Sequence, residues 1–121
     1  MKSFFLSAVL VLGFSASAQA PTPAPLTRAG VPGELHHHLQ IENAFIRVYF
    51  VEVPAHDATL LHQHDEDYVF AAIGAADVTS AVPGKPEVHL QLADGEVRFS
   101  RGRFAHVARN NVDTAFRNVT I

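Results

Sequence analysis

The sequence predicts an all-β domain, a sandwich or barrel of short strands. Three observations predict this fold class. The segments between turns are rich in β-branched and aromatic residues, turn residues recur about every eight to twelve positions, and no segment after the N-terminal leader has helical periodicity. About eight or nine short strands with this spacing are typical of a sandwich or barrel, and no internal repeat suggests a second one.

The first twenty residues have the features of a secretory signal peptide. Lys2 supplies a positive start, an apolar run extends from Phe4 to Phe14, and residues 18–20 (Ala-Gln-Ala) form a small-residue cleavage site. We therefore expect residues 1–20 to be a cleaved signal peptide and the mature protein to be periplasmic or extracellular. The apolar run is too short to span a bilayer comfortably and no other such run follows, so we expect no membrane span.

Composition narrows the classes of function. Cleavage would remove 20 of the 121 residues and leave 101, enough for one domain, and loss of Lys2 would change the formal net charge from −3 to −4. An acidic chain lacks the basic footprint of a nucleic-acid-binding protein. There is no cysteine, which excludes disulfides and thiol nucleophiles, and all eight histidines follow the predicted leader. A metal site would explain this density of histidine.

The predicted domain follows a tether. Residues 21–33 contain four prolines among Ala, Thr and Gly, which indicates an extended linker, and we place the domain at residues 34–121. Pro54, Gly74 and the Asp94-Gly95 turn end successive strands. The strands that we expect cover residues 35–42, 45–53, 59–64, 68–73, 77–82, 88–92, 97–100, 104–109 and 115–121.

Two histidines in one of these strands suggest a metal site. His62 and His64 are two positions apart, so their side chains should project from the same face. Carboxylates follow immediately, and His106 lies in a later predicted strand. Imidazoles that converge with a carboxylate suit a mid-to-late transition metal. A bound cation would also satisfy nitrogens that are expensive to bury in a small barrel.

The first part of this pattern resembles a motif of the cupin superfamily. His62-x-His64, then Asp67 and six residues to Gly74, is similar to G(x)5HxH(x)3–4E(x)6G. His56 stands where the motif has its leading glycine, and the acid comes one residue early as Asp instead of Glu. Glu66 is an alternative to Asp67, because it shares strand parity with the two histidines.

The second cupin motif, G(x)5PxG(x)2H(x)3N, is similar to the stretch that begins at Gly95 and contains His106 and Asn110. Arg101 and Arg103 replace its proline and second glycine. The twenty residues between the two stretches are a spacing typical of small cupins, and the resemblance covers roughly residues 45–121.

The resemblance implies a single cupin-type jelly-roll β-barrel with one divalent transition metal, Fe, Mn, Zn, Cu or Ni, inside it. Its ligands would be His62, His64, Asp67 and His106, with Glu66 as the alternative carboxylate. Asn110 would stabilise the turn. Because cupins commonly dimerise through barrel strands, a homodimer is a further expectation.

Other side chains are weaker candidates. In the triplet of residues 36–38, His36 and His38 could bind metal, although a solvated domain edge is the simpler expectation. We expect His89 on the surface and His56 in a turn. A cluster of arginines surrounds the second motif, and Arg101, Arg103 or their neighbours Arg98 and Arg109 could clamp a substrate carboxylate, although an exposed rim is the simpler expectation. Tyr68 could offer its hydroxyl as an acid or orienting group.

The motifs that the sequence lacks point to metal chemistry. It contains no G-x-S-x-G, no H-E-x-x-H and no phosphate- or dinucleotide-binding glycine motif. A metal would therefore have to supply the difficult step of any reaction. We expect a metal-dependent enzyme, of dioxygenase type, that acts on a small molecule. The alternatives are a non-catalytic module for a metal or small ligand, and a degenerate barrel with an empty site.

Overall fold

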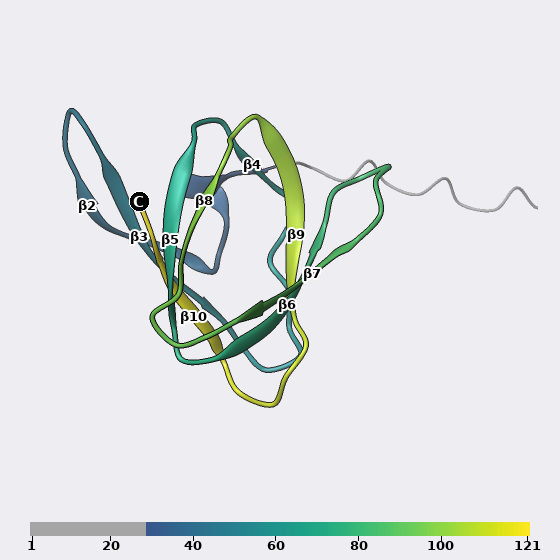
Figure 1. Ribbon diagram of the computed structural model, residues 1–121. Helices are drawn as coiled ribbons and strands as arrows, with labels where there is room; N and C mark the ends of the chain where they lie inside the picture. Colours follow the sequence, from purple (N-terminus) through teal and green to yellow (C-terminus); the bar gives the residue numbers. More distant parts are fainter. Residues whose placement is uncertain (1–28) are drawn as a thin grey trace, which may run out of the picture.

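The computed structural model describes residues 29–121. These residues form two facing β-sheets (Figure 1). In chain order the elements are β1 (Ala29–Gly30), the 3₁₀ helix η1 (Val31–Gly33), β2 (His37–Glu42), β3 (Arg47–Val53), β4 (His62–His64), β5 (Tyr68–Ile73), β6 (Ala76–Ala81), β7 (Val88–Leu92), β8 (Val97–Ser100), β9 (Phe104–Asn110) and β10 (Phe116–Thr120). The predicted signal peptide, residues 1–20, and residues 21–28 of the predicted tether lie outside the described residues.

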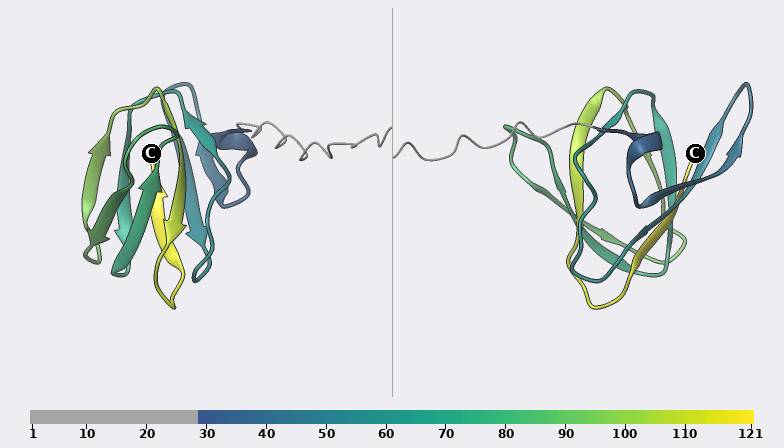
Figure 2. Two further views of the ribbon diagram at one scale, coloured as in Figure 1. Left: turned by 90° about the vertical axis from the view of Figure 1, so that its right-hand side faces the viewer. Right: turned by 180° about the vertical axis from the view of Figure 1, so that it is seen from behind.

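The strand order is that of a jelly-roll barrel. One sheet has the order β1-β4-β9-β6-β7 and the other β2-β3-β10-β5-β8. All pairings are antiparallel except that of β1 with β4. The tip of the β2–β3 hairpin projects away from the body of the barrel (Figures 1 and 2). The predicted all-β fold class is thus confirmed.

Strands with strict alternation or long apolar runs have the predicted bounds, as in β5, β7 and β8. The strand expected at residues 59–64 is shorter, and only His62–His64 forms β4. The residues before it contact β9 outside a regular ladder, because Ala58 forms an isolated bridge with Arg109 and the Thr59 N–H donates to the Ala108 carbonyl. Residues 29–33, expected in the tether, belong to the fold because β1 pairs with β4. Within residues 29–121, no helix has the length and apolar character needed to cross a bilayer.

The core lies between the sheets and surrounds a cavity of about 310 Å³. Inward and outward residues alternate along β3, as expected for a sheet with one buried face. The buried apolar residues are Tyr49, Val51, Val53, Ala72, Val78, Leu92 and Phe116. Asn110 is also buried, and its amide donates to the carbonyls of Val53, Pro54 and Thr114. It therefore ties the end of β9 to neighbouring loops, in line with the structural role expected for it.

Five positions of the described chain have the left-handed backbone that favours glycine. Gly74, Gly84 and Gly95 have φ angles of 81°, 75° and 73°, and His56 and Arg103 have φ angles of 58° and 66°. His56 and Arg103 are the two residues that stand at motif glycines. Their side chains adopt this backbone conformation less readily than glycine does.

Candidate metal centre

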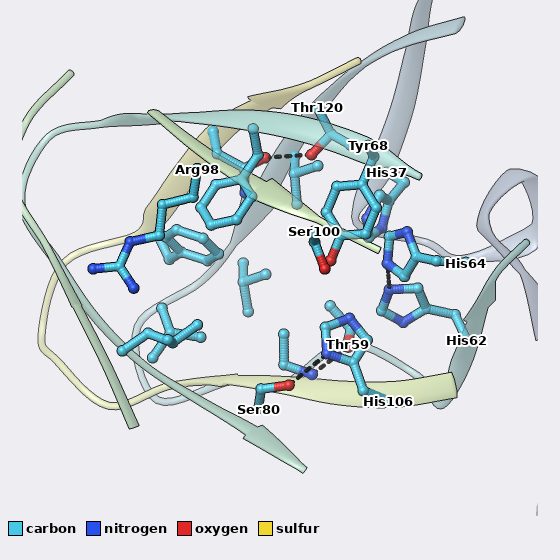
Figure 3. Close-up of a pocket in the computed structure, with 18 of the residues that line it drawn as sticks. His37, Thr59, His62, His64, Tyr68, Ser80, Arg98, Ser100, His106 and Thr120 are labelled. Atoms are coloured by element: carbon cyan, nitrogen blue, oxygen red, sulfur yellow. Dashed lines mark hydrogen bonds between the residues drawn. The ribbon is translucent and has the colours of Figure 1, made fainter. Parts of the chain in front are cut away.

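Three of the predicted ligands meet inside the barrel. His62 and His64 are both buried on the inner face of β4, and sheet register places His106 of β9 directly opposite His62. The ring centroids of His62 lie 4.9 Å from His64 and 4.7 Å from His106, and those of His64 and His106 are 5.2 Å apart. Figure 3 shows the three rings at one end of the cavity. Strand alternation and strand pairing together produce this convergence.

His37 joins the cluster from the other sheet. It is the first residue of β2, and its ring centroid lies 4.8 Å from that of His62. One ligand nitrogen from each of His37, His62 and His64 lies within 4.8 Å of the other two, which is a grouping that could hold a metal ion. Of the triplet, sequence reasoning considered His36 and His38. Both lie on the opposite side of the strand: His36 bonds to the Glu52 carbonyl and His38 is exposed.

A buried carboxylate orients His37. Glu34 is only 2% exposed, and one of its oxygens accepts hydrogen bonds from His37 Nδ1 at 2.6 Å and from the His36 N–H at 2.9 Å. Its other oxygen accepts from the Leu60 N–H at 3.1 Å. Burial acts to raise the pKa of Glu34, but these hydrogen bonds together lower it to about 2. Glu34 is therefore ionised and only accepts, so His37 Nδ1 carries the proton of this hydrogen bond.

The same arrangement recurs at two other rings. His62 Nδ1 donates to the Leu60 carbonyl at 2.8 Å, which leaves Nε2 without a proton, and His106 Nδ1 bonds to Ser80 Oγ at 2.7 Å. His62 Nε2 and His64 Nε2 are 3.0 Å apart. Two nitrogens bound to one ion at the usual zinc–nitrogen distance lie about 2.9–3.3 Å apart, for octahedral to tetrahedral angles. The donor set thus fits a transition-metal ion, and the bond to the Leu60 carbonyl fixes the tautomer of His62.

Burial keeps these imidazoles neutral. It lowers the pKa of His62, and it lowers the pKa values of His64 and His106 to about 3, with smaller contributions from neighbouring histidines. A metal ligand must be an unprotonated imidazole, so His62, His64 and His106 can bind a cation at neutral pH without first losing protons.

The two predicted carboxylates lie elsewhere. Glu66 and Asp67 are exposed in the turn between β4 and β5 and are not among the residues that line the cavity. Asp67 Oδ1 accepts the Gly102 N–H at 2.9 Å, and Gly102 approaches so closely that a Cβ there would lie 2.2 Å from the Glu66 carbonyl oxygen. The strand ends at His64, so strand parity no longer orients the next side chains. The group that could hold a metal contains His37 and neither carboxylate.

Tyr68 lines the cavity, whereas Arg101 and Arg103 do not. Its ring stacks on His64 at a centroid distance of 4.2 Å, and burial raises the pKa of its hydroxyl, an effect that a hydrogen bond with Ser100 opposes. Arg101 and Arg103 are exposed outside the cavity. Arg98 does border the cavity, but its guanidinium contacts the Glu96 carboxylate at 2.7 Å.

The remaining predicted surface residues are exposed. His56 bonds to Asp113 in its turn, His89 approaches the Thr79 hydroxyl at 3.2 Å, and Arg109 pairs with Glu87.

Sequence reasoning missed Glu34, His37 and Ser80. Glu34 precedes His37 by three residues, a weak signal because the segment has neither helical nor alternating hydrophobicity. Ser80 and His106 are brought together only by the pairing of β6 with β9. Neither contact could be found from one motif alone.

Comparison with known proteins identifies the fold. No protein-family model matches the sequence, and no curated protein matches it. Among solved structures, the chain is similar to a cupin domain from Bordetella pertussis Tohama I, with a TM-score of 0.66, 26% identity and coverage of 78% of this chain and 93% of that one. A Cupin 2 conserved barrel domain protein from Salinispora arenicola CNS-205 matches with a TM-score of 0.53 and 12% identity, over 86% of this chain and 87% of that one.

A third similar structure is an uncharacterised conserved protein with a double-stranded β-helix domain from Klebsiella pneumoniae subsp. pneumoniae MGH 78578. Its TM-score is 0.57 at 15% identity, and the match covers 69% of this chain and 71% of that one. The low identities of the Salinispora and Klebsiella matches support the architecture of the chain and carry no information about its ligand.

Proposed function

We propose that the protein is a member of the cupin superfamily that binds one divalent transition-metal ion through His37, His62 and His64. His106, whose ring centroid lies 4.7 Å from that of His62, would be a fourth nitrogen donor. One observation carries this proposal. The imidazoles of His62, His64 and His106 are buried and neutral, and they converge with His37 while hydrogen bonds hold the Nδ1 atoms of His37, His62 and His106. An apolar core has no need of such polar groups, and a cation would give the His62 and His64 Nε2 atoms, which contact each other at 3.0 Å, a shared partner.

The donor set guides the choice of metal. Imidazole ligands suit Zn, Cu, Fe and Ni, and Mn, which prefers oxygen donors, fits less well once the carboxylate is absent from the group. A bound ion of this kind would supply Lewis acidity toward a substrate oxygen or, for Fe and Cu, redox chemistry with dioxygen.

We infer that the cavity beside the histidines binds a small molecule, and that the protein is a metal-dependent enzyme of dioxygenase type. The cavity walls are largely apolar, and His64 and Tyr68 stack side by side at its polar end. With a raised pKa the Tyr68 hydroxyl keeps its proton at neutral pH and is able to donate a hydrogen bond to a ligand oxygen. The second candidate is a non-catalytic binding module, favoured by the absence of any acidic residue from the cavity lining within residues 29–121.

The metal test uses tag-free protein. Elemental analysis after equilibration with Zn²⁺, and separately with Fe²⁺, should give about one equivalent. The variants His37→Ala, His62→Ala and His106→Ala should each lose most of it. His38→Ala is the matched control, because His38 is the exposed neighbour of His37 on the same strand. Equal metal content in all variants, or none in the parent protein, would contradict the proposal.

Turnover is tested separately. Oxygen uptake by the iron-loaded protein is measured across phenols, thiols and keto acids. Uptake that depends on both the metal and His37 supports an oxygenase. Tight ligand binding without uptake, in protein that holds its metal, supports the binding module.

Export is part of the proposal, on the strength of the leader at residues 1–20. Expression of the whole sequence in a Gram-negative host should yield a mature protein that begins at Pro21, detected by mass spectrometry in the periplasm. Full-length protein confined to the cytoplasm would contradict it.

We also propose a homodimer through the outer face of the sheet that contains β5 and β8. Val69, Ile73 and Val97 are 37%, 45% and 63% exposed on these paired strands, which leaves neighbouring apolar side chains in solvent. Light scattering should give twice the mass of the mature chain, and Val97→Asp should give a monomer. A monomeric parent protein would exclude the dimer.

A further inference from the structure

We propose that the ligand of this cavity is a small, predominantly apolar molecule that carries its oxygen at one end and no charge at the other. This inference rests on the proposed function, because it assigns the substrate class of the same site. It is argued from the lining, the charges and the mouth of the cavity. Figure 3 shows that the lining divides into a histidine end and an opposite end near Arg98.

The walls between these ends are apolar. They consist of valine, leucine and phenylalanine side chains from both sheets, among them Val51, Val78, Leu92, Phe70 and Phe116. The volume of about 310 Å³ equals that of about ten water molecules in the liquid, which limits the ligand to a small molecule. Apolar atoms of the ligand would be removed from water against these walls, which is the favourable term for binding.

The polar side chains of the cavity are already paired. Thr120 Oγ1 donates to Asn118 Oδ1 at 2.7 Å, and Thr59 Oγ1 accepts the Ala108 N–H at 2.9 Å. Across residues 29–121, no buried side-chain nitrogen or oxygen lacks a partner. A ligand with several polar groups would thus lose its hydration without gaining hydrogen bonds away from the histidine end.

No free charge is available at the opposite end. Arg98 is the sole lysine or arginine among the described lining residues, and none of them is acidic. Its Nε donates to Glu96 at 2.7 Å and its terminal nitrogen to the Gln91 carbonyl at 3.3 Å. A carboxylate on the tail of the ligand would therefore be buried without a counter-charge, or would have to displace Glu96.

The mouth of the cavity is apolar too. Val88 on β7 lines the cavity and is 54% exposed, so the opening lies at the edge strand β7. β7 and β8 are edge strands of different sheets and do not pair with one another. Apolar ligands would meet an apolar rim on entry.

The test compares two phenols that differ only in the charge of the tail. Binding of p-cresol and of 4-hydroxyphenylacetate to tag-free protein is titrated by ¹H–¹⁵N NMR, in zinc-loaded and in chelator-stripped samples. We expect p-cresol to bind, with shifts at cavity residues, and 4-hydroxyphenylacetate to bind about tenfold or more weakly.

Matched variants locate the binding. Ala108→Leu on β9 adds volume to the cavity wall and should abolish p-cresol binding, whereas Ala105→Leu on the same strand, at a position that does not line the cavity, should not. Thermal unfolding and zinc content confirm that each variant is intact. Leu90→Phe is the second filling variant if Ala108→Leu does not fold.

Each outcome bears on the proposal. Equal or tighter binding of the carboxylate, or p-cresol binding that survives both filling variants, would overturn it, as would the absence of p-cresol binding to either form. Selective p-cresol binding to protein that takes up no zinc would support the ligand class while the metal proposal fails, so the two are separable.

Discussion

The histidine cluster draws on two regions that are organised in different ways. His62, His64 and His106 lie on the paired strands β4 and β9, where register alone sets one imidazole opposite another. His37 comes from the first residue of edge strand β2, where the Glu34 carboxylate holds the ring. The first region is positioned by backbone hydrogen bonds and the second by a buried charge. We therefore expect the two to respond differently to pH and to loss of their outer partners.

The largest expected difference between the two regions is in how they affect the free energy of unfolding at low pH. In metal-free protein, His64 and His106 have pKa values of about 3, against 6.5 for an ordinary histidine. Between these values the unfolded chain binds more protons, so the stability is complete above pH 6.5 and is lost as pH falls toward 3. Each histidine should lower the free energy of unfolding by up to about 1.4 kcal/mol per pH unit in this window.

Glu34 affects the stability over a lower range of pH. Its pKa of about 2, against 4.5 for an ordinary glutamate, gives stability that is present above pH 4.5 and is lost as pH falls toward 2. Urea unfolding across pH 2–8 should show that His64→Gln with His106→Gln flattens the upper window, whereas Glu34→Gln flattens the lower one. Identical pH profiles for both variants would remove the distinction between the two regions.

The next largest effect concerns metal affinity. Glu34→Gln keeps the shape of the side chain but removes the charge on the partner of His37, and should weaken zinc binding by about 10–100-fold. Competition with a chromogenic chelator measures this. Glu42→Gln, an exposed glutamate paired with Arg47 on the same hairpin, is the control and should bind zinc like the parent. An unchanged zinc affinity in Glu34→Gln would mean either that His37 is not a metal ligand or that Glu34 does not support its binding.

A smaller effect is expected on the β4–β9 side. Ser80→Ala removes a neutral hydroxyl from His106 Nδ1, and a neutral hydrogen bond contributes about 0.5–1.5 kcal/mol, so zinc affinity should fall by about tenfold at most. The same chelator competition applies, with Ser100→Ala as control because Ser100 is the partner of Tyr68. A loss as large as that in Glu34→Gln would mean that the outer partners of both regions matter equally.

The smallest effect lies outside the cluster. Arg103→Gly removes the strain of a left-handed backbone at a side chain that disfavours it. The greater freedom of glycine in the unfolded chain offsets part of this gain, so the variant should be more stable by about 0.5 kcal/mol. The melting temperature should rise by about 2–4 °C in thermal unfolding. Arg101→Gly, an exposed neighbour without a positive φ angle, should instead lower it. A lower melting temperature in both variants would show that Arg103 bears no strain.

Elements are predictable from the sequence where local pattern and tertiary structure agree. β7 was predicted to the residue because Val88–Leu92 alternates strictly, and His62 and His64 share a face because a strand has a period of two. Asp67 and Glu66 follow the end of that strand, and there no period constrains a side chain. Asp67 instead satisfies the Gly102 amide in a neighbouring turn.

His37 and Glu34 could not be predicted from pattern. β2 is an edge strand whose residues after His37 are all exposed, so neither of its faces is marked by hydrophobic residues. His37 is oriented by the Glu34 carboxylate, which the fold buries. The same carboxylate accepts a hydrogen bond from the Leu60 N–H, 26 positions later in the sequence. The leader at residues 1–20 remains a prediction, because it lies outside the described residues.

The backbone angles at His56 and Arg103 have a consequence for how distant relatives of this chain can be found. Glycine adopts such a backbone most readily, yet neither position holds glycine. A search that requires that amino acid will pass over such chains, whereas superposition of main-chain atoms will retrieve them. This accords with a sequence that matches no family model and a fold that matches solved barrels.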